Sequence, residues 1–132
     1  MKKQVDALKK IERLHKQMHD LASWRLAALE SARADLVEDH RAMLAAMDGG
    51  AMSYGAPALA ATRRIRSLEV KIAAAEAECA AQTKRVFEQG TRAKLADRAL
   101  DDAEARYRET RERKELAELI DSSLRNPKSS SA

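Results

Sequence analysis

A seven-residue repeat of mostly small and apolar side chains runs without a break through the second half of this chain. A strict spacing of 3.5 residues is the pattern of a helix that packs lengthwise on another helix. Such a rod has no concave pocket for catalysis, so we expect its function to lie in what its surface binds. With Ile65 at position a, the core series is Ala58, Ala61, Ile65, Leu68, Ile72, Ala75, Cys79, Gln82, Val86, Gln89, Ala93, Ala96, Leu100, Ala103, Tyr107, Thr110 and Lys114.

The composition agrees with a helical, cytoplasmic protein. Charged residues make up 35% of the 132 residues and aromatic residues only 3%, which is typical of long helices and coiled coils. No apolar run approaches the roughly 20 residues that a membrane span requires, so we expect no membrane insertion. The single cysteine rules out a disulfide within the chain. The net charge of +4 arises from interleaved charges of both signs, which argues against nucleic acid as the main partner.

A first helix is predicted over residues 4–47. Its apolar stripe averages about 3.6 residues per step, which predicts a nearly straight helix whose register drifts against the second one. The predicted stripe is Leu8, Ile11, Leu14, Met18, Leu21 or Ala22, Leu26, Leu29, Ala32, Leu36, His40, Met43 and Met47.

A turn is predicted over residues 48–57, followed by a second helix over 58–125 and a disordered tail over 126–132. Gly49 and Gly50 follow the first stripe as a stop signal, and Pro57 suits the first turn of the next helix. So short a connection makes the two helices antiparallel neighbours. The predicted fold is therefore all-α, a single long antiparallel two-helix coiled-coil hairpin over residues 1–125.

The second helix is longer than the first, so its C-terminal part is predicted to overhang. Pairing Met47 with Ala58 sets facing residue numbers that sum to about 105, so that Leu100 meets Val5. Residues from about Asp102 to Arg125 then have no partner in this chain. At 1.5 Å per residue, this overhang measures on the order of 35 Å.

Basic and apolar residues gather at the overhanging end. Leu116, Leu119, Ile120 and Leu124 form an apolar stripe outside the heptad phase, and alternating Arg and Glu residues precede it. The charges alone are consistent with a solvated helix held by i,i+4 pairs, and the stripe alone with dimerisation. Presentation of both to an acidic protein partner is the interpretation that uses the two features together.

No catalytic or cofactor-binding motif is present. His15 and His19 have the spacing of two zinc ligands, but no third ligand is evident, and we interpret them as surface histidines. Cys79 falls at a core position and is expected to be a small buried hydrophobe. Gln82, with Gln89 beside Gly90, places polar groups at core positions and marks a weak point. We expect a non-enzymatic protein without a metal or cofactor.

The hairpin plan and two segments resemble the FliJ family of the bacterial flagellar type III export apparatus, which has YscO-like counterparts in virulence-type secretion. The stretch Leu8-Lys-Lys-Ile-Glu-Arg-Leu14, followed by Leu26-Ala-Ala-Leu29, resembles the opening helix of that family. The stretch Arg111-Glu-Arg-Lys-Glu-Leu-Ala-Glu-Leu-Ile120 resembles its closing segment.

The resemblance implies a coiled-coil stalk, peripheral to the export apparatus at the inner membrane. Its paired termini would enter the ring of the export ATPase, and the middle of the hairpin would contact the membrane export gate protein. Self-association as a structural coiled coil and binding to nucleic acid are the alternative functions. The partner-binding residues that the resemblance implies are Lys9, Lys10, Arg13, Arg106, Arg111, Arg113, Leu116 and Ile120.

Overall fold

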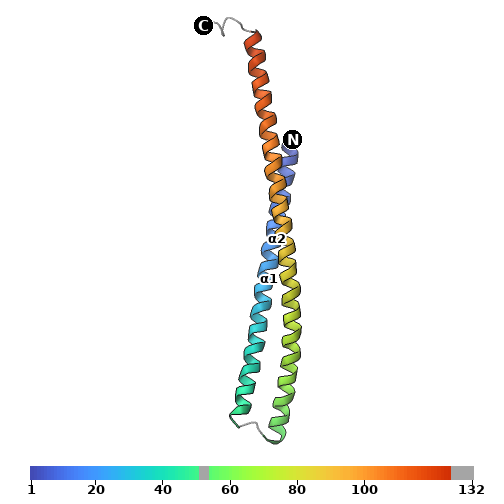
Figure 1. Cartoon of the computed structure of the whole chain (residues 1–132), viewed down its shortest axis with the longest axis vertical. Helices are drawn as coiled ribbons and strands as arrows, with labels where there is room; N and C mark the ends of the chain where they lie inside the picture. The colour runs from blue at the N-terminus through green and yellow to red at the C-terminus, as the bar shows by residue number, and fades with distance from the viewer. Residues whose placement is uncertain (51–53, 126–132) are drawn as a thin grey trace. The chain divides into compact units, whose positions relative to one another are not determined.

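Two long helices make up the part of the chain that the structure describes. The computed structural model describes residues 1–50 and 54–125, where helix α1 spans Lys2–Asp48 and helix α2 spans Gly55–Arg125 (Figure 1). The helices pack against each other in opposite directions, which confirms the predicted all-α antiparallel hairpin. The predicted tail, 126–132, and residues 51–53 of the predicted turn lie outside the described residues.

Glycine sets both helix ends at the turn. The Gly50 N–H donates a hydrogen bond to the Met47 carbonyl at 3.2 Å, with Gly50 at a φ of +84°. That left-handed conformation costs a residue with a Cβ about 1–2 kcal/mol, which explains why glycine stands here. Gly55 opens α2 at a φ of +68°, three residues before the predicted start at Ala58. Pro57 therefore lies in the first turn of α2, where its missing N–H removes no helical hydrogen bond.

The hairpin divides into two compact units. The turn unit is Gln17–Gly90, and the terminal unit joins Met1–Lys16 to the chain from Thr91 onward. Each unit contains a stretch of α1 and a stretch of α2, so each has its own helix–helix seam.

The seam of α2 follows the predicted heptad from Ala58 to Tyr107. Every residue of the series in that range is buried or half-buried, and Leu68 has no exposed surface at all. The prediction is wrong for Thr110 and Lys114, which are exposed because they lie beside or beyond the first residues of α1. The fully or nearly buried seam residues of α2 are Ala61, Leu68, Cys79, Gln82 and Leu100.

The seam of α1 departs from its predicted stripe. Ile11 and Leu14 are 45% and 53% exposed, whereas Glu12 and His15 are half-buried in their place. Ala32, also in the predicted stripe, is exposed. The protected residues recur with the same 3.5-residue period as those of α2, so the predicted period of 3.6 is wrong. The series is Val5, Leu8, Glu12, His15, His19, Ala22, Leu26, Leu29, Leu36, His40, Met43 and Met47, with the exposed Arg33 as its one gap. Met18, Ser23 and Ala46, each next to a member of the series, are also half-buried.

Truncation of Leu68 should destabilise the hairpin more than truncation of a neighbouring exposed residue. Because Leu68 is fully buried in a seam otherwise rich in alanine, Leu68→Ala should cost about 2–4 kcal/mol of unfolding free energy in urea denaturation. Val70→Ala is the matched control, since Val70 is 70% exposed on the same turn. Equal losses for the two variants would contradict the assigned seam.

Candidate partner-binding surface of the terminal unit

In the terminal unit, α1 reaches further along α2 than the sequence register predicted. Lys2, Val5 and Lys9 line one groove together with Glu104 and Tyr107, so Val5 lies beside residues beyond Leu100. The predicted overhang from Asp102 onward is therefore too long. The first turns of α1 flank α2 as far as Arg111, and Met1 and Lys2 border a further hollow that extends to Lys114, Glu115 and Glu118. Helix α2 continues beyond the N-terminus (Figure 1).

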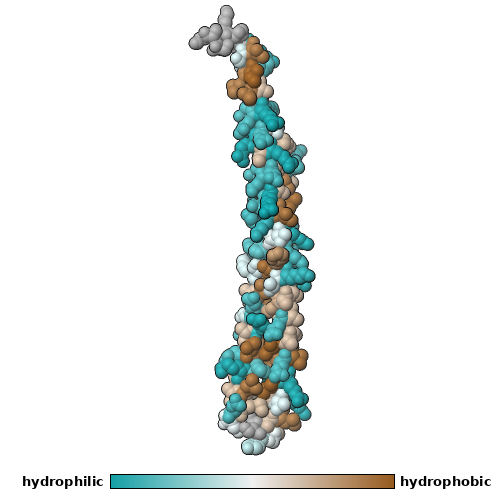
Figure 2. Space-filling view, in the orientation of Figure 1, coloured by the Kyte–Doolittle hydropathy of each residue, from teal (hydrophilic) through white to brown (hydrophobic). Residues whose placement is uncertain are grey.

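We call residues 112–125 the C-terminal extension. All of its residues are exposed, and at 1.5 Å per residue it is about 20 Å long. Its large apolar side chains lie open to solvent, and Figure 2 shows hydrophobic surface gathered just before the C-terminal end of α2. These side chains are Leu116, Leu119, Ile120 and Leu124, with exposed fractions of 58%, 68%, 53% and 76%.

One side of the terminal unit carries only charged residues next to the seam. With Val5 and Tyr107 at position a, the groove described above is lined by residues at positions a, b and e. Every b and e position of residues 1–16 of α1, and of residues 91–118 of α2, holds a charged residue. We call these residues the charged side: Lys2, Asp6, Lys9, Arg13 and Lys16 of α1, and Lys94, Asp97, Asp101, Glu104, Arg108, Arg111, Glu115 and Glu118 of α2.

The charged side is largely compensated within the unit. Lys16 forms a salt bridge with Glu12, and the hydrogen bond and charge of Glu12, followed by the charges of Asp97 and Asp101, raise the pKa of Lys16. Arg111 pairs with Glu115 at 3.3 Å along the same helix. Lys16 of α1 therefore lies close enough to Asp97 and Asp101 of α2 for their charges to act on it, which favours this pairing of the two helices.

The opposite side of the terminal unit has a different chemistry. A second groove there is lined by Leu8, Ala99 and Ala103 with Gln4, Asp102 and Arg106, all at positions c, d and g. On α1, these flanking positions carry no charge. We call the c and g residues the apolar side: Gln4, Ala7, Ile11 and Leu14 of α1, and Arg92, Leu95, Ala99, Asp102, Arg106, Glu109, Arg113, Leu116 and Ile120 of α2.

The structure divides the predicted partner-binding residues between these two sides. Lys9 and Arg111 line the same groove on the charged side, where Arg13 also belongs. Arg106 lines the groove on the apolar side, and Lys10 sits on the outer face of α1, away from the seam. Arg113, Leu116 and Ile120 share the heptad positions of the apolar side. The apolar side itself was missed, because a 3.6-residue period assigned Ile11 and Leu14 to the core.

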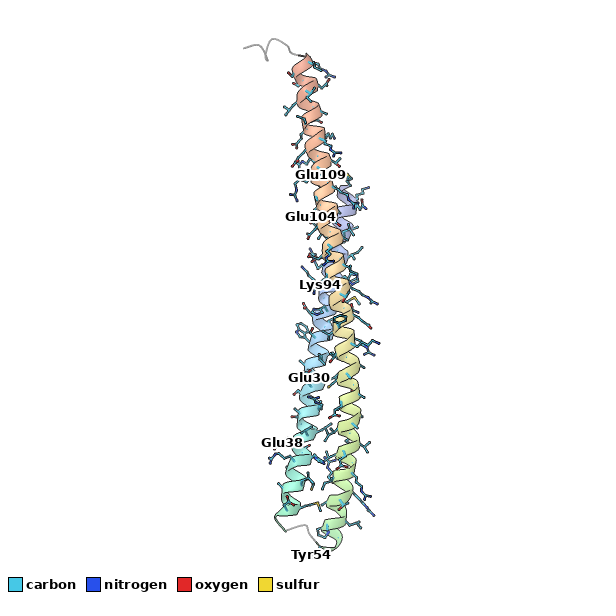
Figure 3. The ribbon with its side chains drawn as sticks, viewed as in Figure 1. Glu30, Glu38, Tyr54, Lys94, Glu104 and Glu109 are labelled. Carbon is cyan, nitrogen blue, oxygen red and sulfur yellow. The ribbon has the colours of Figure 1, made fainter. Side chains whose placement is uncertain are left out.

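The basic excess of the terminal unit resides on α1. Residues 1–16 contain six Lys and Arg against two Asp and Glu, whereas residues 91–125 contain nine of each. Carboxylates such as Glu104 and Glu109, labelled in Figure 3, balance the arginines of α2. The predicted cationic end is thus a property of the first helix more than of the second.

The turn unit contains the polar seam residue Gln82. Its side chain is 3% exposed, and its Nε2 donates a hydrogen bond to the Ala22 carbonyl at 3.0 Å across the seam. This hydrogen bond gives the buried amide a partner across the seam, which offsets the cost of burying a polar side chain there. Gly90 leaves room for the His19 ring, which would lie 3.4 Å from an added Cβ.

The other residues that the sequence singled out, Cys79, His40 and His15, lie at the helix–helix seam. Cys79 is buried, as predicted, and His40 is half-buried at the seam with its Nε2 3.3 Å from Glu69 Oε1. His15 is half-buried rather than a solvated surface residue, and its Nδ1 is a buried atom without a hydrogen-bond partner. In residues 1–50 and 54–125, no group of three or more His, Cys, Asp or Glu side chains could hold a metal ion.

Comparison with known proteins adds no relative. No protein-family model, curated protein or solved structure matches this chain. Neither described helix has a stretch that is both long and apolar enough to span a bilayer.

The pKa of Lys16 gives a direct check of the local charge arrangement. Because Glu12 is the largest cause of the raised value, Glu12→Gln should lower the Lys16 pKa toward its ordinary value. An NMR titration that follows the Lys16 side chain measures this change. Glu38→Gln is the control, since Glu38 pairs with Arg41 at 2.7 Å in the turn unit. An unchanged Lys16 pKa in the Glu12 variant would show that the pair does not form.

Proposed function

We propose that this protein is a non-enzymatic component of a flagellar type III export apparatus, in which its terminal unit binds the export ATPase as a coiled-coil stalk. The observation that supports the proposal best is the C-terminal extension, a continuous helix that leaves its partner helix behind and presents apolar side chains to solvent. Isolated helices of this length are marginal in water, so a binding partner would stabilise it. The resemblance of the opening and closing segments to the FliJ family supplies the identity of that partner.

The ATPase contact is assigned to the extension and the residues just before it. Arg113, Leu116 and Ile120 provide a cationic and apolar stripe along one face of a helix, and such faces dock into grooves of partner proteins. Arg111 and the basic residues of α1, Lys9 and Arg13, lie on the other side of the same unit. A partner that encloses the end of the hairpin would contact both sides.

The gate contact is assigned to the turn unit. Trp24, the single tryptophan, is 70% exposed and lies with Gln17, Asp20 and Leu21 around a shallow hollow on α1. Exposed tryptophans are over-represented among residues that dominate the energy of protein interfaces. This surface is therefore the candidate for contact with the export gate protein.

Charge reversal in the closing segment tests the ATPase contact. Arg111→Glu with Arg113→Glu should weaken binding to the hexameric export ATPase of the same bacterium at least about tenfold, because both substitutions replace attraction to an acidic partner with repulsion. Calorimetry or a pull-down measures binding, and circular dichroism confirms that helix content is kept.

The matched control is Arg63→Glu with Arg66→Glu, two exposed arginines of α2 in the turn unit. This pair should leave ATPase binding unchanged. Wild-type affinity in the Arg111/Arg113 variant, or an equal loss of affinity in the control, would contradict the assignment of the ATPase contact to this segment.

Self-association is the second candidate function, and the four exposed apolar residues of the extension are the observation that favours it. If the protein acts as a stalk, analytical ultracentrifugation should find a monomer at high concentration, because four side chains per chain bury too little area for a stable dimer. A dimer that dissociates on Leu116→Glu with Ile120→Glu would instead support a self-associating structural protein.

A further inference from the structure

The paired part of the terminal unit has a net positive charge, and that charge comes from α1. Residues 1–16 contain six Lys and Arg against two Asp and Glu, whereas residues 91–111 contain six against five. On the apolar side of α2, Arg92 and Arg106 are matched by Asp102 and Glu109. An anionic partner is therefore attracted to α1 rather than to α2.

Two lysines of α1 lie on the side of the helix that is turned away from the seam. Lys3 and Lys10 are exposed and stand seven residues apart at position f, the heptad position farthest from the partner helix. In residues 1–50 and 54–125, no ion pair involves either lysine, whereas Lys16 is held by Glu12. The charges of Lys3 and Lys10 are thus available to a partner.

Exposed apolar side chains lie beside these lysines. Ile11 and Leu14 are 45% and 53% exposed and follow Lys10 by one and four residues, on the same outward half of the helix. Asp6 is the single acidic residue on the outward half of residues 1–16, and Arg13 offsets its charge. We call the uncharged and basic residues along this strip the lysine surface: Lys3, Ala7, Lys10, Ile11 and Leu14.

The shape and chemistry of the lysine surface fit the surface of a bilayer. Lys3 and Lys10 stand on the convex outer side of a single helix, where no second wall receives a helical partner. A helix with lysines next to exposed apolar side chains can lie in the bilayer interface, with its ammonium groups on lipid phosphates. Nucleic acid would attract the lysines equally but would leave Ile11 and Leu14 in water. The combination of the two residue types therefore favours an anionic bilayer.

We propose that the lysine surface binds the surface of an anionic phospholipid bilayer, with Lys3 and Lys10 on lipid phosphates and Ile11 and Leu14 among the headgroups. Such binding requires no segment that spans the bilayer. The inference goes beyond the proposed function, because its partner is a lipid and it uses none of the residues assigned to the ATPase contact.

Co-sedimentation of the full-length protein with vesicles tests the proposal. The protein should bind vesicles of phosphatidylglycerol and phosphatidylcholine in equal amounts at least about tenfold more tightly than vesicles of phosphatidylcholine alone, because the lysines are attracted to anionic lipid. Added salt should weaken the binding, since it screens charges at the surface. No binding to the anionic vesicles, or equal binding to both kinds, would overturn the proposal.

Two variants separate the charged and the apolar contributions. Lys3→Gln with Lys10→Gln should weaken binding to the anionic vesicles at least about tenfold. Ile11→Gln with Leu14→Gln should also weaken this binding at least about tenfold, because buried apolar area adds to the electrostatic attraction. Circular dichroism should show unchanged helix content, since all four residues are exposed. Wild-type vesicle binding in either variant would contradict the proposed surface.

The matched control is Lys94→Gln with Arg98→Gln, which removes the same charge from exposed residues of α2 in the same unit. This control should keep vesicle binding near the wild-type level. An equal loss of binding in the control would show that binding follows net charge rather than the lysine surface, and would overturn the proposal.

Double-stranded DNA provides the second comparison. Binding to DNA without binding to anionic vesicles, kept in the Ile11/Leu14 variant, would identify a surface for nucleic acid and would also overturn the proposal. The Lys3/Lys10 variant should bind the ATPase as the wild type does, because the ATPase contact uses other residues. The lipid proposal and the ATPase proposal can therefore fail separately.

Discussion

The structure depends on one geometric constraint, the common 3.5-residue period of its two seams. A helix can remain in contact with another over many turns only if both return a side chain to the interface with the same period. The heptad of α2 is explicit in its sequence. Helix α1 adopts the same period, and it buries fewer apolar side chains as a result. Glu12 and His15 enter the seam, while Ile11 and Leu14 are left at its edge.

Two of the polar residues at this weakly apolar seam have partners that offset the cost of their burial. Alanine and cysteine bury little area, so several registers would have similar hydrophobic energies. The Gln82 side chain finds the Ala22 carbonyl at 3.0 Å, and Glu12 is neutralised by Lys16. The Lys16–Glu12 pair lies within α1, so it neutralises a seam carboxylate in any register, whereas the Gln82 hydrogen bond satisfies a buried amide across the seam and avoids the penalty of an unpaired polar group.

The same register gives the terminal unit two sides of unlike chemistry. On one side, lysines of α1 lie next to carboxylates of α2, and these charges support the pairing of the helices. On the other side, α1 offers alanine, isoleucine and leucine, and the arginines of α2 have no acid facing them from α1. The large exposed apolar side chains of the terminal unit lie on this second side and on the C-terminal extension.

The sequence alone determined the fold class, the position of the turn and the seam of α2, because heptad spacing and paired glycines are local signals. It also located the extension, but it placed the start about ten residues too early. The register taken from the turn paired Val5 with Leu100, whereas Val5 lies beside residues beyond Leu100. The side chains of Ile11 and Leu14 could not be placed from α1 alone. Their exposure depends on the packing of α1 against α2, whose heptad is strict, because two helices that pack lengthwise share one period. Only the tertiary structure therefore separated the charged side from the apolar side.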